Sequence, residues 1–212
     1  MSSNYNQLEI NKDGINRIIK QISSSITTPK NCISELIGSM ISRTTILSFS
    51  FINKTLIIIG NDGGLIDGDI EKLQEYFNTS NKGHSVYGIG CRVAAKNITD
   101  KSNFEHFYIL DRIKNKSKGI DFYTKSENDN LEYNDLNDLE CSNLLKKYYT
   151  SEIDKFDNKD ITIWIVPYSD EFEQNKTNIK NHIKIKFNKP IIDNEIDIYF
   201  ESEKIKINVP YY

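Results

Sequence analysis

The sequence predicts one α/β domain in which helices come first and a sheet dominates later. Near the start, isoleucines recur at the i, i+3, i+4, i+7 spacing of a helix with one buried stripe, at Ile15, Ile18, Ile19, Ile22 and Ile26. Later segments are short, rich in β-branched and aromatic residues and bounded by Gly, Asn and Asp, which is typical of strands. The chain has 212 residues, of which 38% are hydrophobic, so we expect one large domain, or one domain with a small appendage, and not two full domains.

Further helices are expected on both sides of a glycine-rich region. A second helix begins after Pro29, and its apolar face consists of Ile33, Leu36, Ile37, Met40 and Ile41. Asp67 or Asp69 can cap a third helix, which carries Ile70, Leu73, Tyr76 and Phe77. A fourth helix is expected over 91–98 and a short one over 144–149. Residues 78–90 are rich in Gly, Ser and Asn, so we expect a loop or lid there.

Strand patterns make up most of the second half. The expected strands cover residues 55–59, 104–113, 120–124, 161–168, 183–187, 196–200 and 204–209. Residues 125–139 are acidic, Asn-rich and weakly patterned, and they are expected to form an excursion loop.

The charge of the chain does not support nucleic-acid binding. A formal net charge of −3 provides no basic field of the kind that draws proteins to a phosphate backbone. Lysines gather at two places, which we interpret as solvated surface: Lys114, Lys116 and Lys118, and Lys180, Lys184, Lys186 and Lys189.

The cysteine and hydropathy patterns predict an intracellular protein that does not enter a membrane. Cys32, Cys91 and Cys141 lack the CxxC or Cys/His spacing of a zinc site, so we expect reduced, structural thiols. Residues 1–12 are polar, and no apolar run approaches the ~20 residues that span a bilayer.

Three polar clusters lie at the ends of expected elements. Glu35 and Ser39 are one turn apart on the second helix. Residues 60–64 (GNDGG) form a turn after the first expected strand, and residues 83–90 (GHSVYGIG) precede the fourth helix. The free N–H groups at a helix N-terminus can bind phosphate, and Gly88 and Gly90 would let a ligand approach the backbone closely.

In this order the three clusters resemble the N, G1 and G2 boxes of the GHKL ATPase superfamily. The matching segments are 34–39 (SELIGS), 57–65 (IIIGNDGGL) and 87–95 (YGIGCRVAA). The superfamily includes type II topoisomerases, MutL, the ninety-kilodalton heat-shock chaperones, sensor histidine kinases and MORC proteins. Residues 160–166 (DITIWIV) and a strand pair at 196–208 are similar to later parts of the MORC and topoisomerase modules, and the layout is nearest to MORC.

The resemblance implies a fold and a division of the chain. The fold is a two-layer α/β sandwich of mixed β-sheet and helices, the Bergerat arrangement, with a nucleotide held between the helices and the lid. Residues 1–180 would form the nucleotide-binding domain. Residues 181–212 would be C-terminal strands, the remnant of a transducer-like domain.

The resemblance also implies ligands and residue roles. ATP is the implied ligand, Mg²⁺ its metal, and Glu35 the carboxylate that orients or deprotonates the attacking water. Ser39 occupies the metal-ligand position. The nucleotide contacts carry over to Asn61, Asp62, Gly63, Gly64, Lys82, Gly88, Ile89 and Gly90. Lys82 would meet the γ-phosphate as a point charge, and a solvated loop lysine is the alternative.

Two departures from the family pattern affect the implied site. Ser39 replaces an Asn, and its hydroxyl is shorter and less basic than an amide carbonyl, so Mg²⁺ affinity should fall. In the G1 segment, an alignment without a gap places Gly60 at the adenine-reading Asp. An alignment with one residue deleted instead matches Asn61-Asp62-Gly63 to an Asn-Asp-Gly form, which keeps a side chain that can hydrogen-bond adenine.

The expected function is therefore that of an ATP-binding module whose nucleotide state alters self-association, for example as a homodimer, or partner binding, with slow Mg²⁺-dependent hydrolysis. The rival interpretation is a non-catalytic scaffold that keeps the fold without useful nucleotide affinity. A DNA-associated MORC- or topoisomerase-like role depends on fold analogy alone.

Overall fold

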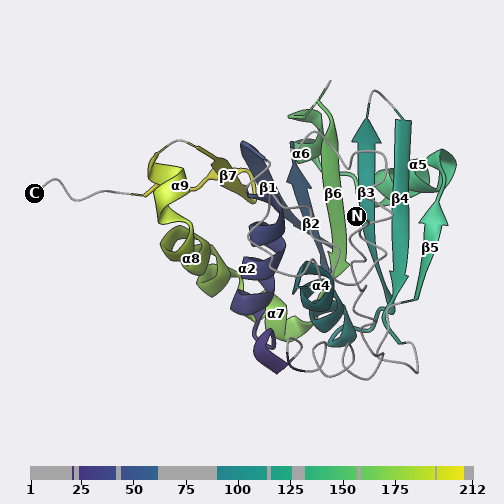
Figure 1. The fold of residues 1–212 in the computed structure, drawn as a ribbon, viewed down its shortest axis with the longest axis horizontal. Helices are drawn as coiled ribbons and strands as arrows, with labels where there is room; N and C mark the ends of the chain where they lie inside the picture. The colour runs from purple at the N-terminus through teal and green to yellow at the C-terminus, as the bar shows by residue number, and fades with distance from the viewer. Residues whose placement is uncertain are drawn as a thin grey trace, which may run out of the picture.

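Eight strands form one mixed sheet in the order β5-β4-β3-β6-β2-β1-β7-β8 (Figure 1). The structure is a computed structural model that describes residues 21, 24–41, 44–61, 90–113, 116–125, 132–156, 159–193 and 195–207. The strands are β1 (Ile46–Ile52), β2 (Thr55–Gly60), β3 (His106–Ile113), β4 (Lys116–Tyr123), β5 (Glu132–Leu136), β6 (Ile161–Pro167), β7 (Asp197–Phe200) and β8 (Glu203–Lys204). Neighbouring strands are antiparallel, except that β1 and β7 are parallel.

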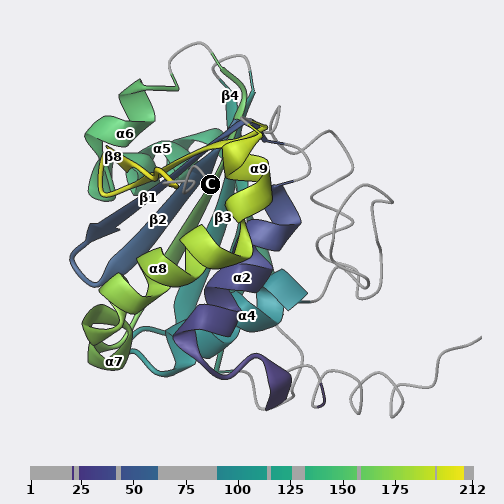
Figure 2. The same cartoon turned by 90° about the vertical axis from the view of Figure 1, so that its left-hand side faces the viewer.

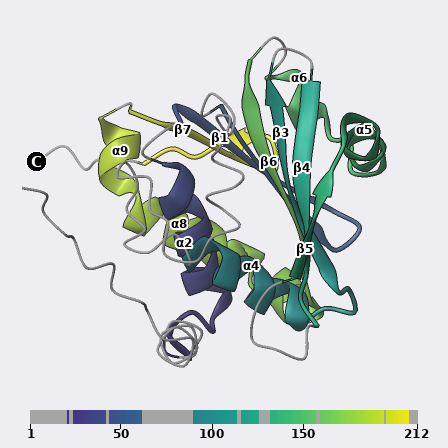
Figure 3. The same ribbon diagram turned by 45° about the vertical axis from the view of Figure 1, so that its right-hand side comes forward.

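Helices lie on both faces of this sheet. They are α2 (Pro29–Met40), α4 (Gly90–Asp100), α5 (Asp138–Lys147), α6 (Ser151–Asp154), α7 (Asp170–Gln174), α8 (Lys176–Lys186) and α9 (Asn188–Ile192). Figures 2 and 3 show α2, α4 and α8 on one face, which we call the helix face, and α5 on the opposite face. The expected α/β class with a mixed sheet is confirmed. In the described part of the chain, no helix is both long and apolar enough to cross a membrane.

Two apolar cores separate the faces of the sheet. Along β2, Leu56 and Ile58 pack into the larger core beneath α2 and α4, whereas Ile57 and Ile59 pack into the smaller core beneath α5 and α6. Every residue of β2 is buried, because strands with cover on both faces read as continuous apolar runs rather than alternating ones. The run of β-branched residues in the sequence therefore predicted this central strand correctly.

Helix α2 forms where the sequence predicts it. Thr28 Oγ1 accepts a hydrogen bond from the Asn31 N–H at 3.3 Å, and Pro29 occupies the first turn, where its missing N–H costs nothing. The predicted apolar stripe is buried in the larger core, at Ile33, Leu36, Ile37 and Met40. Helix α4 confirms the helix expected over 91–98.

The strand expected at 183–187 is wrong, because this segment belongs to α8 and its C-terminal cap. Isoleucines alternate with lysines there, which suggests a strand, yet Ile179, Ile183 and Phe187 are spaced four residues apart. All three are buried in the core on the helix face, so the longer helical period prevails over the local alternation. Position 181 consequently lies inside α8, and β7 continues the common sheet beside β1.

The loop expected at 125–139 is also wrong in part, since β5 and the start of α5 lie within it. Strand β5 is an edge strand that pairs only with β4, so its side chains remain largely polar and leave no apolar alternation to detect. Asn137 and Glu140 form a capping box that begins α5. Of the strand expected at 204–209, Lys204 belongs to β8, residues 205–207 are not in a strand, and residues 208–209 lie outside the described residues. Strand β1 is a strand that the pattern did not predict. The expected third helix, and residues 15–20 of the first, lie outside the described residues.

One buried carboxylate connects α6 to the sheet on the face opposite to α2 and α4. Glu152 accepts hydrogen bonds from Ser48 on β1 at 2.8 Å and from Ser202, in the turn between β7 and β8, at 2.6 Å. Lys155 Nζ lies 2.8 Å from one oxygen and 3.0 Å from the other. Burial alone would raise the pKa of this carboxyl, but the bonds from the lysine and the two serines outweigh it and hold the pKa below its usual value of 4.5.

A lowered pKa in the folded state means that Glu152 stabilises the protein at neutral pH and that this contribution disappears as the pH falls through the folded pKa, below 4.5. We expect Glu152→Gln to lower the free energy of unfolding by about 1–3 kcal/mol at neutral pH and to weaken its acid dependence. Urea denaturation between about pH 3 and pH 7 measures both, with the exposed Glu195→Gln as a matched control. A variant that keeps the acid dependence of the parent would contradict this role.

Candidate functional site

Two predicted site residues, Glu35 and Gly90, meet where α2 crosses the first turn of α4. Glu35 is half-buried on α2, and Gly90 is the first residue of α4. A Cβ atom added at Gly90 would collide with the Glu35 carboxylate. In the observed conformation, the Glu35 carboxylate therefore uses the space that the missing side chain of Gly90 leaves.

The helix N-terminus beside Glu35 has a defined electrostatic character. The first N–H groups of an α-helix have no partner within the helix and carry a partial positive charge. The Glu35 carboxylate at this end is consequently in a favourable field. A negatively charged ligand group bound at the same end would lie within reach of both the helix N–H groups and the carboxylate.

Ser39 lies one turn further along α2 and faces the same end of α4. Its hydroxyl donates to the Leu36 carbonyl at 2.7 Å and forms a hydrogen bond with the Cys91 thiol. Burial raises the pKa of Cys91 despite the opposing influence of this bond and of Arg92, so the thiol stays protonated. Ser39 therefore contributes an oxygen atom at this end, and Cys91 is unsuited to act as a thiolate ligand.

Asn61 directly follows β2, and its side chain is hydrogen-bonded to residues 44–46 at the start of β1. Its Oδ1 accepts from the N–H groups of Thr45 and Ile46 at 3.0 and 2.7 Å and lies 2.7 Å from Thr44 Oγ1. Its Nδ2 donates to Thr45 Oγ1 at 2.9 Å. These contacts give Asn61 a structural role at the entry to β1, which reduces its capacity to read a base.

The structure also reveals a polar row that the sequence analysis missed. Gly60, Thr162 and Asp111 are register partners across β2, β6 and β3. Gly60 and Asp111 lie two residues after Ile58 and Ile109, and Thr162 lies two residues before Trp164. Those three apolar residues belong to the core beneath α2 and α4, so the row lies on the helix face. The signal in the sequence was a single acid among the apolar residues of 107–113.

This row lies at the same end of the helix layer as the predicted site. The Met40 methyl group, at the C-terminal end of α2, covers Gly60, since a Cβ there would come within 2.6 Å of Met40 Cε. The other predicted contacts lie outside the described residues: Asp62, Gly63, Gly64, Lys82, Gly88 and Ile89. Within the described ranges, no group of three or more His, Cys, Asp or Glu side chains is arranged to hold a metal ion.

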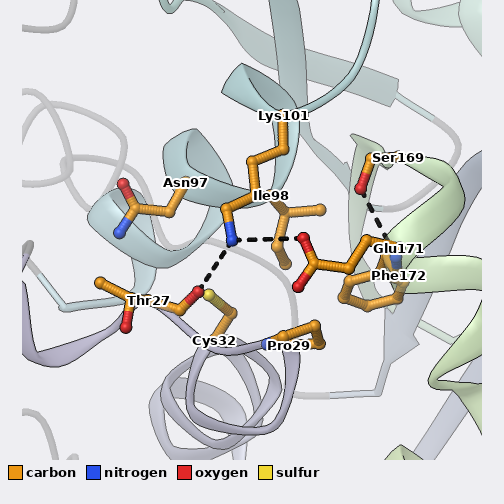
Figure 4. A pocket seen from close by; sticks show the side chains of 9 residues that line it. All are labelled: Thr27, Pro29, Cys32, Asn97, Ile98, Lys101, Ser169, Glu171 and Phe172. Carbon is orange, nitrogen blue, oxygen red and sulfur yellow. Dashed lines mark hydrogen bonds and ion pairs between the residues drawn. The ribbon is translucent and has the colours of Figure 1, made fainter.

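A small cavity lies at the opposite end of the same helix pair (Figure 4). It is lined by residues before and at the start of α2, at the end of α4 and around α7, among them Thr27, Cys32, Lys101 and Glu171. Its volume of about 10 Å³ accommodates about one water molecule. Lys101 Nζ donates to the Thr27 carbonyl at 3.1 Å and lies 3.6 Å from Glu171, so polar contacts close this end. A nucleotide does not fit in this cavity.

The contacts of Asn61 generate a stability prediction. Asn61→Ala should lower the free energy of unfolding by about 1–3 kcal/mol, because it leaves the N–H groups of Thr45 and Ile46 without their acceptor. Asn61→Asp keeps that acceptor and should cost less. Urea denaturation of both variants measures the difference, and a loss of less than about 0.5 kcal/mol for the alanine variant would refute the structural role.

No family model matches the chain, and no curated protein is found to match it.

Proposed function

We propose that this protein is a GHKL-type ATP-binding module whose nucleotide state controls self-association or partner binding, with slow Mg²⁺-dependent hydrolysis. The observation that carries the proposal is the contact between Glu35 and the N-terminal turn of α4 at Gly90. It supports the proposal because the N and G2 segments resemble the family's boxes independently of each other, and the fold brings their key residues together.

The topology adds independent support. The candidate G1 segment begins within β2 and continues past its last residue, and the segment that resembles the family's later strand is β6, the neighbour of β2 in the sheet. The described parts of the N, G1 and G2 segments thus lie at one end of the helix face. A triphosphate at this end would meet the N–H groups of α4, while its base would lie towards the ends of β2 and β6.

In this arrangement Glu35 supplies the reactive side chain. Its carboxylate can accept a hydrogen bond from a water molecule, orient that water towards the γ-phosphorus and take up its proton as the P–O bond to the leaving diphosphate breaks. The N–H groups of α4 stabilise the negative charge of the phosphate oxygens. Phosphoryl transfer depends mainly on positioning and charge stabilisation, so these two contributions are the ones that the protein has to make.

The residues fit Mg²⁺ only in part. Mg²⁺ prefers six oxygen ligands and usually takes one or two from the protein and the rest from phosphates and water. Ser39 Oγ is an oxygen at the right helical position, but its proton is directed at the Leu36 carbonyl and its neighbour is a thiol. When bound, the metal would neutralise phosphate charge. Because the protein itself supplies only a poor ligand to Mg²⁺, we expect slow turnover.

The non-catalytic scaffold remains the second candidate function. Two observations favour it. Ser39 stands where the family has an amide ligand for Mg²⁺, and the side chain of Asn61 is already hydrogen-bonded to the start of β1, so the metal contact and the base contact that the family uses are both weakened. The two functions differ in one measurable quantity, which is affinity for ATP.

The first prediction of this proposal is that the purified protein releases or absorbs heat on titration with ATP and Mg²⁺. Glu35→Ala should abolish hydrolysis yet leave the ATP dissociation constant within about threefold, because a water-orienting carboxylate is not a phosphate contact. The exposed Glu105→Gln serves as the matched control and should keep both properties. Absence of heat and of any thermal shift at millimolar ATP would select the scaffold.

The second prediction concerns the metal. Ser39→Asn should increase the Mg²⁺ affinity of the ATP complex by about tenfold, because an amide carbonyl is a better ligand for a hard cation than this hydroxyl. Titration of Mg²⁺ into the protein with saturating ATP measures the change. Ser39→Ala should shift the affinity the other way, and equal affinities in all three proteins would show that position 39 is not a ligand.

A further inference from the structure

The two most exposed large apolar side chains in the described part of the chain belong to two different helices. Leu139, on α5, is 69% exposed, and Ile185, on α8, is 74% exposed. Figures 1 and 3 show these helices on opposite faces of the sheet and towards its opposite edges. The function proposed above uses neither residue.

Leu139 lies between two acids in the first turn of α5. The three exposed residues that we call the acidic face are Asp138, Leu139 and Glu140. Asp138 accepts a hydrogen bond from the Ser117 N–H at 2.7 Å, and Glu140 accepts one from the Asn137 N–H at 2.8 Å. These bonds hold both carboxylates in place and keep their charge. Consecutive helix residues are about 100° apart around the axis, so Leu139 has a negative border on both sides.

Ile185 lies between two lysines near the end of α8. The three residues that we call the basic face are Lys184, Ile185 and Lys186. Helix α8 contains no acidic residue, and burial, followed by the charge of Lys186 and Lys30, lowers the pKa of His182 below its usual value of 6.5. Glu203 is an acid on this side, but it forms an ion pair with Lys180 at 2.6 Å. The border of Ile185 therefore remains positive.

The two faces are complementary to each other. A single exposed apolar residue is ordinary on a protein surface and needs no partner. Here, however, two of them lie in matching frames of opposite charge, acid-Leu-acid and Lys-Ile-Lys. Contact between the frames removes both apolar side chains from water and brings two carboxylates to two ammonium groups. Because the faces lie on opposite sides of the sheet, only a second molecule can bring them together.

We propose that the acidic face of one copy of this chain docks on the basic face of the next copy. Such an interface joins two different surfaces, so association proceeds head to tail and either closes into a ring or continues as an open chain. The inference goes beyond the proposed ATP-binding function and does not depend on it, because neither face includes Glu35, Ser39 or Gly90.

Sedimentation velocity of the nucleotide-free protein tests this self-association. The average mass of the parent should rise between about 10 µM and about 500 µM, which is the range expected for a small interface. The rise should be smaller at about 0.5 M salt, because exposed charges are screened. Leu139→Gln and Ile185→Gln should each weaken association by at least about tenfold, since each replaces the apolar centre of one face by a polar residue that suits a helix.

Mixing the two variants tests whether the faces bind each other. An equimolar mixture of Leu139→Gln and Ile185→Gln contains one parental basic face and one parental acidic face, on different molecules. It should therefore form a dimer at the strength of the parent and nothing larger. Phe104→Gln, which changes an exposed apolar residue between α4 and β3, is the matched control and should associate like the parent.

Each result decides for or against the inference. A parent that stays monomeric over this range overturns it, and so does a glutamine variant that associates like the parent. A mixture that associates no more strongly than the separate variants overturns it as well, because the two faces then do not bind each other. Thermal denaturation checks that the variants fold, and serine at the same position replaces a glutamine that does not.

Discussion

The close approach of α2 to the first turn of α4 is the constraint on which the candidate site depends. It places the Glu35 carboxylate against the N-terminal turn of α4, in the space that a side chain at position 90 would occupy. The carboxylate thereby lies at the end of α4 that carries a partial positive charge. The same crossing brings Ser39 to Cys91. The apolar stripe of α2 then holds this helix on the sheet, so the position of the polar groups follows from packing.

Among the described residues, one buried acid lies on each face of the sheet, Asp111 and Glu152, and the two differ in their surroundings. Glu152 is satisfied by Ser48, Ser202 and Lys155, which join α6, β1 and the last hairpin. That network has the character of a structural connection, because every partner comes from an element that it holds in place. Asp111 instead lies in a row with a hydroxyl and a glycine at the end where the candidate motifs converge. Burial of a carboxylate costs free energy in both places, so each acid depends on polar neighbours.

The occupied side chain of Asn61 changes how the G1 segment is interpreted. Compared by sequence alone, Asn61 and Gly60 are rival positions for a base-reading residue. In the structure, Asn61 satisfies the backbone N–H groups of Thr45 and Ile46, and Gly60 leaves a space that Met40 covers. The described part of the G1 segment therefore serves the sheet and its helix cover rather than presenting a free polar side chain.

The sequence by itself determined the elements whose signal is local. The stripe of α2 and the β-branched run of β2 specify a helix and a strand, because each element buries a regular set of its own side chains. The tertiary structure decided the rest. Edge strand β5 has one neighbour and little apolar surface, and α8 is helical because Ile179, Ile183 and Phe187 face a common core. The meeting of Glu35 with Gly90, and of Asp111 with Thr162, depends on contacts between segments distant along the chain, which no local pattern encodes.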